Sequence, residues 1–188
     1  MPLRKEIRVI GFDDASFDKF NDTQTLLIGV VYRGGQFMDG VVSSIIDIDG
    51  DNATSVMIQL VQSCKFQPQL RCILLDGIAV GGFNIIDTQQ LAEQTGIPVL
   101  IVIRDYPDIQ SMHAALKKLE MERKITLLNK AGPIEQVNKV YVQRINLSSE
   151  EAKEILDITC THSHLPEPLR IAHLIGQGIM MGESKGRA

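Results

Sequence analysis

The strongest constraint on the fold of this chain is a change of hydrophobic period after the polar segment Asp49-Gly50-Asp51-Asn52. Before this segment, three apolar stretches rich in β-branched residues span residues 7–12, 25–32 and 40–48, and such stretches predict β-strands. After it, apolar residues recur at helical spacing, at Ala53, Val56, Met57, Leu60 and Val61. The period therefore predicts three strands followed by a helix, with Asp51 or Asn52 placed to cap the helix start.

The next part of the chain alternates between strands and helices. The first helix is expected to end before Pro68, and two short continuous apolar runs, at residues 72–75 and 98–103, have the character of strands buried on both faces. A second helix near residues 86–94, ending at Gly96, lies between them. This order implies right-handed crossovers and a parallel half of the sheet. The turn Arg33-Gly34-Gly35-Gln36 predicts that the second and third strands are antiparallel neighbours.

The remainder of the chain is expected to be mainly helical, from residue 107 through 118 to about 129, with a strand at 139–144 and a last helix at 166–181. Ser148, followed by Glu150 and Glu151, is a helix-capping signal. The fold class is therefore α/β: a mixed sheet of three antiparallel strands and then two parallel strands, flanked by helices. We expect residues 1–188 to form a single domain.

Charge and composition limit the functional classes. The chain has 19 basic and 23 acidic side chains, a net charge of −4, so no global basic field attracts nucleic acid. No apolar run approaches the ~20 residues that cross a bilayer, and the N-terminus does not continue as a signal peptide. The three cysteines lack zinc or disulfide spacing. These features predict a cytoplasmic protein without a membrane partner, and they leave its oligomeric state open, a homodimer included.

Acidic residues follow several of the predicted strands. If the first strand is central and the fourth lies beside it, Asp13 and Asp76 end neighbouring strands at the edge where ligands collect. Carboxylates in such a place suit Mg²⁺ or Mn²⁺, and Asp49 or Asp51 could supply a third ligand. The structural alternatives are that Asp76-Gly77 only ends a strand and that Asp51 only caps a helix. For Asp13 and Asp76 together, the functional interpretation is favoured.

Several motifs resemble those of endonuclease V. They are Gly11-Phe12-Asp13, Leu74-Leu75-Asp76-Gly77, Gly96-Ile97-Pro98-Val99 and the segment from Leu165 to Ala172. The chain is more similar still to an uncharacterised, mainly archaeal family related to that enzyme, through Asp49-Gly-x-x-Ala53-Thr54 and Arg104-x-Tyr106-Pro107. The resemblance covers nearly all 188 residues. It implies a ribonuclease-H-like fold and a divalent metal, Mg²⁺ or Mn²⁺, bound by Asp13 and Asp76 for phosphodiester cleavage.

The sequence also departs from endonuclease V. After Asp76-Gly77 it reads Ile78-Ala-Val-Gly-Gly-Phe-Asn, where that enzyme has glycine and a histidine-proline-arginine segment. The glutamate expected before the first helix and the tyrosine-proline wedge are absent. Two functions follow from the resemblance and its gaps. The first is a metal-dependent phosphodiesterase acting on DNA or RNA, and the second is an inactive nucleic-acid or nucleotide-binding protein on the same fold.

Other residues are candidates for binding the substrate. The loop containing Gly77, Gly81 and Gly82 is expected to lead into a helix. A tight turn is the favoured interpretation of these glycines, and the alternative is that their amides bind a substrate phosphate at the helix end. Arg104 and Tyr106 follow the fifth strand, where they could hold a phosphate and stack on a base, or form surface contacts.

The last helix and a basic stretch complete the set of candidates. Arg170 and His173 share a helix face with Glu167, either directed toward the carboxylates or as a salt-bridged surface. The basic residues from Lys117 to Lys124 alternate with glutamates, which is typical of a solvated helix and only weakly of a nucleic-acid patch.

Overall fold

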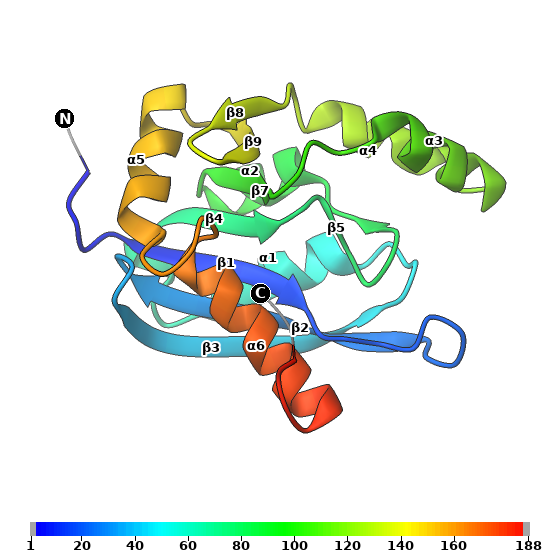
Figure 1. Ribbon diagram of the computed structural model, residues 1–188, viewed down its shortest axis with the longest axis horizontal. Coiled ribbons are helices and arrows are strands. Elements are labelled where there is room, and N and C mark those ends of the chain that lie inside the picture. Colours follow the sequence, from blue (N-terminus) through cyan, green and yellow to red (C-terminus); the bar gives the residue numbers. More distant parts are fainter. Residues whose placement is uncertain (1–2, 186–188) are drawn as a thin grey trace.

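A seven-stranded mixed sheet with helices on both faces forms the body of the protein (Figure 1). The computed structural model describes residues 3–185. The strand order is β3-β2-β1-β4-β7-β9-β8. The strands are β1 (Arg8–Asp14), β2 (Gln24–Arg33), β3 (Phe37–Asp47), β4 (Leu70–Asp76), β7 (Val99–Ile103), β8 (Glu135–Val137) and β9 (Val140–Ile145). A separate ribbon pairs β5 (Ala79–Val80) with β6 (Asn84–Ile85).

The sheet confirms the predicted fold class. β1, β2 and β3 are antiparallel neighbours, and β1, β4 and β7 run parallel. β9 corresponds to the strand expected at residues 139–144 and pairs antiparallel with β7. β8 was not predicted from the sequence, because its three residues are too few to show a period.

The helices differ more from expectation. They are α1 (Ala53–Ser63), α2 (Thr88–Thr95), α3 (Ile109–Lys118), α4 (Ile125–Lys130), α5 (Ser149–Thr159) and α6 (Glu167–Met181), with 3-10 turns η1 (Gln67–Gln69) and η2 (Glu122–Lys124). The helix expected to run on to about residue 129 is broken, because Glu120 adopts a positive φ of 56°. The capping box predicted at Ser148 is confirmed. Among residues 3–185, no helix combines the length and apolar character needed to cross a membrane.

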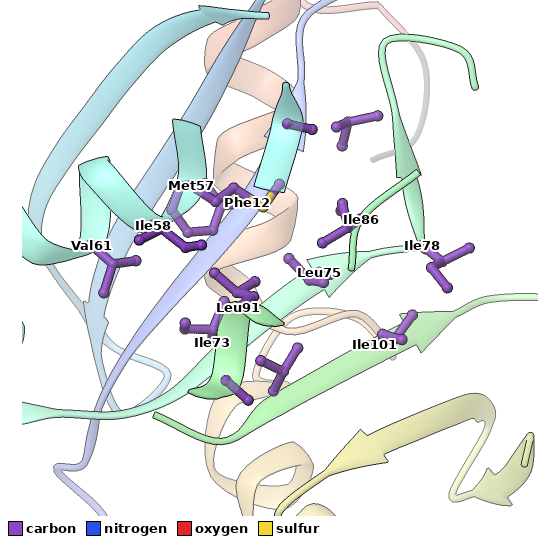
Figure 2. Packing of buried hydrophobic residues seen from close by; sticks show 14 of the residues in the cluster. Phe12, Met57, Ile58, Val61, Ile73, Leu75, Ile78, Ile86, Leu91 and Ile101 are labelled. Atoms are coloured by element: carbon purple, nitrogen blue, oxygen red, sulfur yellow. The ribbon is translucent and has the colours of Figure 1, made fainter. Parts of the chain in front are cut away.

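Each face of the sheet has its own apolar core. Phe12, Ile73 and Leu75 point toward α1 and α2, where they pack with Met57 and Leu91 (Figure 2). On the opposite face, residues such as Val9, Leu74 and Val102 pack against α5 and α6. Because successive side chains of a strand point to opposite faces, the central strands are apolar at nearly every position.

Helix α6 lies unusually close to β1, and two glycines permit this. A Cβ added to Gly11 would lie 2.8 Å from Cβ of Pro168, and one added to Gly176 would lie 2.9 Å from Cα of Ala15. Two sequence motifs that are far apart along the chain therefore meet, Gly11-Phe12-Asp13 and the segment from Leu165 to Ala172. The close packing brings His173 of α6 to the end of β1, beside Asp13.

The glycine loop confirms the favoured interpretation, a tight turn, and corrects the expectation that it leads directly into a helix. Gly81 and Gly82 do not lead into a helix; they form the turn between β5 and β6, with φ values of 54° and 76°. Helix α2 begins later, and its N-terminus is capped by the side chain of Asp87, which accepts from the amide of Gln90. Because Asp87 already caps α2, and Gly81 and Gly82 lie outside this helix, the loop does not form the predicted phosphate site at a helix N-terminus.

The N-terminus of α1 corrects the prediction that Asp51 or Asn52 caps this helix. Asn52 occupies the N-cap position, but its side chain makes no capping hydrogen bond. Its side-chain amide instead hydrogen-bonds to the backbone N–H and the carboxylate of Asp47. The fully buried side chain of Asn84 accepts from the amide of Ala53 at 3.0 Å. The cap therefore comes from the β5–β6 ribbon, 31 residues away in sequence, which no local pattern indicates.

Candidate active site

Asp13 and Asp76 lie together at one edge of the sheet. In the parallel pairing of β1 with β4, Phe12 is opposite Leu75, so Asp13 and Asp76 follow side by side. Both line an open cavity of about 590 Å³, here named the carboxylate cavity. Its other lining residues are Asp14, Ala15, Ser16, Phe17, Gly77, Val102, Ile103, Arg104 and His173. The carboxyl ends of parallel strands are the usual place for ligands in open α/β sheets.

Asp13 is held on both sides. It is only 6% exposed, its Oδ1 accepts from the amide of Asp14 at 2.9 Å, and its Oδ2 lies 3.0 Å from Nδ1 of His173. Burial raises the pKa of Asp13, and repulsion from Asp76 adds to this, while the contact with His173 opposes it. The contact with Asp13 raises the pKa of His173 in turn. Burial of Asp13 and its contact with His173 therefore act in opposite directions on the charge of this carboxyl.

Asp14 is a third carboxylate that the sequence reasoning did not select. Its Oδ2 accepts from the amide of Gly81 at 2.8 Å, so the β5–β6 turn holds it at the cavity. Burial and then repulsion from Asp13 raise the pKa of Asp14 to about 6. The signal that could have identified it is the unbroken Asp13-Asp14 pair at the end of a buried strand. Successive side chains of a strand point to opposite faces, so Asp13 and Asp14 leave β1 in different directions.

Arg104 provides the second cation of the cavity. Its Nη2 lies 3.5 Å from Oδ2 of Asp76, a long contact for an ion pair. Burial raises the pKa of Asp76, and Arg104 only partly opposes that effect. The side chain of Arg104 is 41% exposed, so it remains accessible to an anionic group entering the cavity.

The donor set of the cavity fits a hard divalent cation. Burial raises the pKa of Asp13, Asp14 and Asp76, and mutual repulsion among them contributes to each shift. A divalent cation between carboxylates converts that repulsion into attraction. In the part of the chain that the structure describes, no three acidic, histidine or cysteine side chains stand as a preformed ligand group. Mg²⁺ usually takes one or two carboxylates together with water and substrate phosphate.

Asp49 and Asp51 do not join the carboxylate cavity. Asp51 pairs with Arg123 and with Nζ of Lys124, and although burial opposes it, contact with Lys124 and Arg123 lowers the pKa of Asp51. Asp49 has a φ of 55° and accepts from the amide of Phe83 at 2.7 Å. The expectation that one of them supplies a third ligand beside Asp13 and Asp76 is not met, because internal partners hold both.

Lys124 is the centre of that second group. It is 2% exposed, and its ammonium donates to the carbonyls of Asp49, Gly50 and Phe83. We refer to Lys124 with these three carbonyls and Asp51 as the lysine anchor. It joins η2 to the loop after β3 and to the β5–β6 ribbon. The expected solvated basic helix is therefore wrong for this residue.

Of three further candidate residues, Gly77 lines the carboxylate cavity, whereas Arg170 and Tyr106 do not. Gly77 lines the carboxylate cavity with a φ of 78°, in open space where a side chain would meet nothing. Arg170 is bound to the buried carboxylate of Glu167 at 2.7 Å and is not among the residues lining the carboxylate cavity. Tyr106 is 65% exposed and packs edge-on against Tyr141.

A second pocket adjoins the carboxylate cavity. It has a volume of about 210 Å³ and shares Gly77 and Ile103 with the cavity. Apart from Gly77 and the side chain of Gln143, its lining is apolar: Ile78, Ala79, Ile103, Pro107, Ile109, Met112 and Leu128. Gln143 is 6% exposed and donates from Nε2 to the carbonyl of Gly132 at 2.8 Å. We name this the side pocket.

Comparison with known proteins finds a matching family model and similar proteins of known sequence and structure. The endonuclease dU family model matches residues 5–180. A UPF0215 protein of Thermococcus sibiricus is 45% identical, over 97% of each chain. A crystal structure of a protein of unknown function from Archaeoglobus fulgidus superposes with a TM-score of 0.86 at 36% identity, over 92% of this chain and 97% of that one.

More distant structures share the fold alone. Endonuclease V of Ciona intestinalis, solved with DNA containing an inosine, has a TM-score of 0.58 and 18% identity, over 89% of this chain and 83% of that one. The likeness confirms the endonuclease V-like fold expected from the sequence motifs.

Proposed function

The chain belongs to the endonuclease dU family, and we propose that it hydrolyses a phosphodiester bond of DNA close to a deoxyuridine, using a divalent cation in the carboxylate cavity. The observation that carries the proposal is the group of three carboxylates with raised pKa values at the ends of two parallel strands. The description of that family supports deoxyuridine in the proposal. Asp13 and Asp76, with Asp14 beside them, would hold Mg²⁺ or Mn²⁺.

The residues of the chain have separate tasks in this proposal. When bound, the cation polarises the scissile phosphate and lowers the pKa of the attacking water. His173 fixes the orientation of Asp13 through the 3.0 Å contact. Arg104, which is exposed and only loosely paired with Asp76, binds a phosphate oxygen. Gly77 leaves open space at the cavity wall, and the DNA strand approaches through this space.

The side pocket accommodates the base. Enzymes that act at a particular base often take it out of the stack into a close-fitting pocket. The side pocket shares a wall with the carboxylate cavity, and its apolar lining suits the faces of a planar ring. Gln143 is the polar side chain of that lining, and beyond the bond that it donates to Gly132, its amide retains one N–H and an oxygen with which to read a base edge. Met112→Trp, which narrows the pocket, is expected to reduce the preference for deoxyuridine over thymidine.

A cleavage assay tests the proposal. Labelled single- and double-stranded oligonucleotides, each with one deoxyuridine, one inosine or no altered base, are incubated with the protein and Mg²⁺ or Mn²⁺, alongside an RNA of the same sequence. We expect cleavage near deoxyuridine, no cleavage with EDTA, and none by an Asp13→Asn, Asp76→Asn double variant purified in the same way. That variant controls for contaminating nucleases.

The main alternative is an inactive binding protein on the same fold, favoured by the missing glutamate and histidine-proline-arginine segment. Salt-sensitive retention of the deoxyuridine oligonucleotide without cleavage in either metal would support this alternative and overturn the catalytic proposal.

A further inference from the structure

The outer edge of the sheet at β3 is open. Within residues 3–185, no strand pairs with the side of β3 that faces away from β2. β3 is 11 residues long, Phe37–Asp47, and contains no lysine, arginine or proline. It has a register shift at Asp39, after which its pairing with β2 is regular from Gly40 to Asp47. Proteins usually protect a free edge with such residues or with a very short strand, because an exposed edge readily pairs with another strand. This edge therefore has the properties of a pairing surface.

An apolar face of the sheet continues uncovered onto this edge. Val30 and Tyr32 of β2 are buried in the core beneath α6, and Leu26 packs against that core. Their cross-strand partners on β3 are Val41, Met38 and Ile45. Paired residues share a face, yet these three side chains are 44%, 51% and 53% exposed. In Figure 1 the last turn of α6, with exposed Ile179, Met180 and Met181, extends past the edge at β3.

The two ends of β3 carry opposite charge. Near its start, Asp39 lies between Arg8 and Arg33, two guanidiniums and one carboxylate, which leaves one net positive charge. At its end, Asp47 accepts hydrogen bonds from the neutral amides of Gln24 and Asn52. An antiparallel second copy of β3 brings each end against the opposite one, so the charges are complementary.

We propose that the protein forms a homodimer in which β3 pairs antiparallel with β3 of a second copy, about a two-fold axis perpendicular to the sheet. The apolar pattern selects the register with Ser43 on the axis. In that register Val41 lies opposite Ile45 of the partner subunit, and Asp47 lies near the Arg8–Asp39–Arg33 group of the partner subunit. A two-fold interface uses the same patch on both chains, and this strand is complementary to itself.

Cross-linking with adjacent serines tests both the dimer and its register. Ser43 and Ser44 are neighbours on β3, but only Ser43 faces its own copy in the proposed register. The distance between paired Cα atoms in antiparallel strands, about 4.5 to 5.5 Å, falls within the range for a disulfide. We expect Ser43→Cys to form a covalent dimer on mild oxidation, whereas Ser44→Cys and the wild type do not.

Sedimentation gives the independent measurement. We expect the wild type to sediment as a dimer at micromolar concentration and Ile45→Lys to weaken association at least tenfold. Ile45 is exposed, so this variant keeps the fold. A wild type that stays monomeric over the whole concentration range overturns the proposal and leaves the edge for a strand of another protein. Cross-linking of Ser44→Cys as fast as Ser43→Cys, or a dimer that Ser43→Cys does not trap, also overturns it.

Discussion

Two groups of acidic residues near the same end of the sheet are neutralised in opposite ways. In the lysine anchor, Asp51 faces two cations of the chain itself, and Lys124 is further satisfied by three carbonyls. In the carboxylate cavity, the basic side chains that line the site beside the three carboxyls are His173 and the loosely paired Arg104. The result is visible in the pKa values, which are lowered for Asp51 and raised for Asp13, Asp14 and Asp76.

The contrast separates a structural role from a functional one. The buried ammonium of Lys124 already has its partners within the chain, so we assign the lysine anchor a structural role. Carboxyls that the fold buries beside one another without enough internal cations are destabilising on their own, and they become favourable when a cation arrives from outside. Perturbed groups in a cavity are accordingly candidates for function.

The largest expected effect distinguishes the two groups by activity. Asp76→Asn should reduce cleavage of a deoxyuridine oligonucleotide by about a thousandfold, because a bound cation contributes several kcal/mol to the transition state. Asp51→Asn is the matched control and should keep activity within a few fold. Single-turnover rates at saturating Mn²⁺ measure both. Equal losses in the two variants would remove the functional distinction between the groups.

The lysine anchor should dominate stability instead. Lys124→Met leaves the carbonyls of Asp49, Gly50 and Phe83 without their donor and Asp51 with Arg123 as its remaining cation. We expect a loss of about 3 kcal/mol in the free energy of unfolding, measured by urea titration. Lys130→Met is the control, since Lys130 is 48% exposed in a surface pair with Asp87, and its loss should be at most about 1 kcal/mol. Similar losses in both would contradict the anchor.

The sequence predicted the carboxylate pair because its members end strands whose order is readable. Asp13 and Asp76 each follow a buried apolar run, and the strand-helix alternation places those runs side by side. Asp49 and Asp51 also follow a strand, so on the sequence they look equivalent. The difference lies in Lys124, more than 70 residues later, whose contact depends on how η2 packs.

The β5–β6 ribbon shows the same limit. Its strands have two residues each, too short for a period, yet Asn84 caps α1 and Gly81 holds Asp14. Local patterns therefore gave the sheet, while long-range polar contacts decide which carboxylates remain free. A single sequence does not encode such contacts in its spacing.

A smaller effect concerns Asp14 and pH. Its pKa rises from 3.8 unfolded to about 6 folded, so the folded state holds the proton more tightly. In metal-free protein this contribution is favourable at low pH and is lost as pH rises through about 6. Asp14→Asn keeps an oxygen to accept from Gly81 and should stabilise the protein at pH 8 by about 1 to 3 kcal/mol, with no gain at pH 3. Urea titrations at the two pH values measure this. Destabilisation at pH 8 would indicate that the charge itself is structural.

The smallest effect tests the external cation directly. A metal that binds only the folded protein stabilises it by about 1.4 kcal/mol at ten times its Kd, which for a chain of this length raises Tm by roughly 3 to 6 °C. Mn²⁺ should produce this rise in the wild type and in Asp51→Asn but not in Asp76→Asn, by thermal unfolding at pH 8. If Asp76→Asn keeps the rise while Asp51→Asn loses it, the cation binds at the lysine anchor and the assignment of the two groups is reversed.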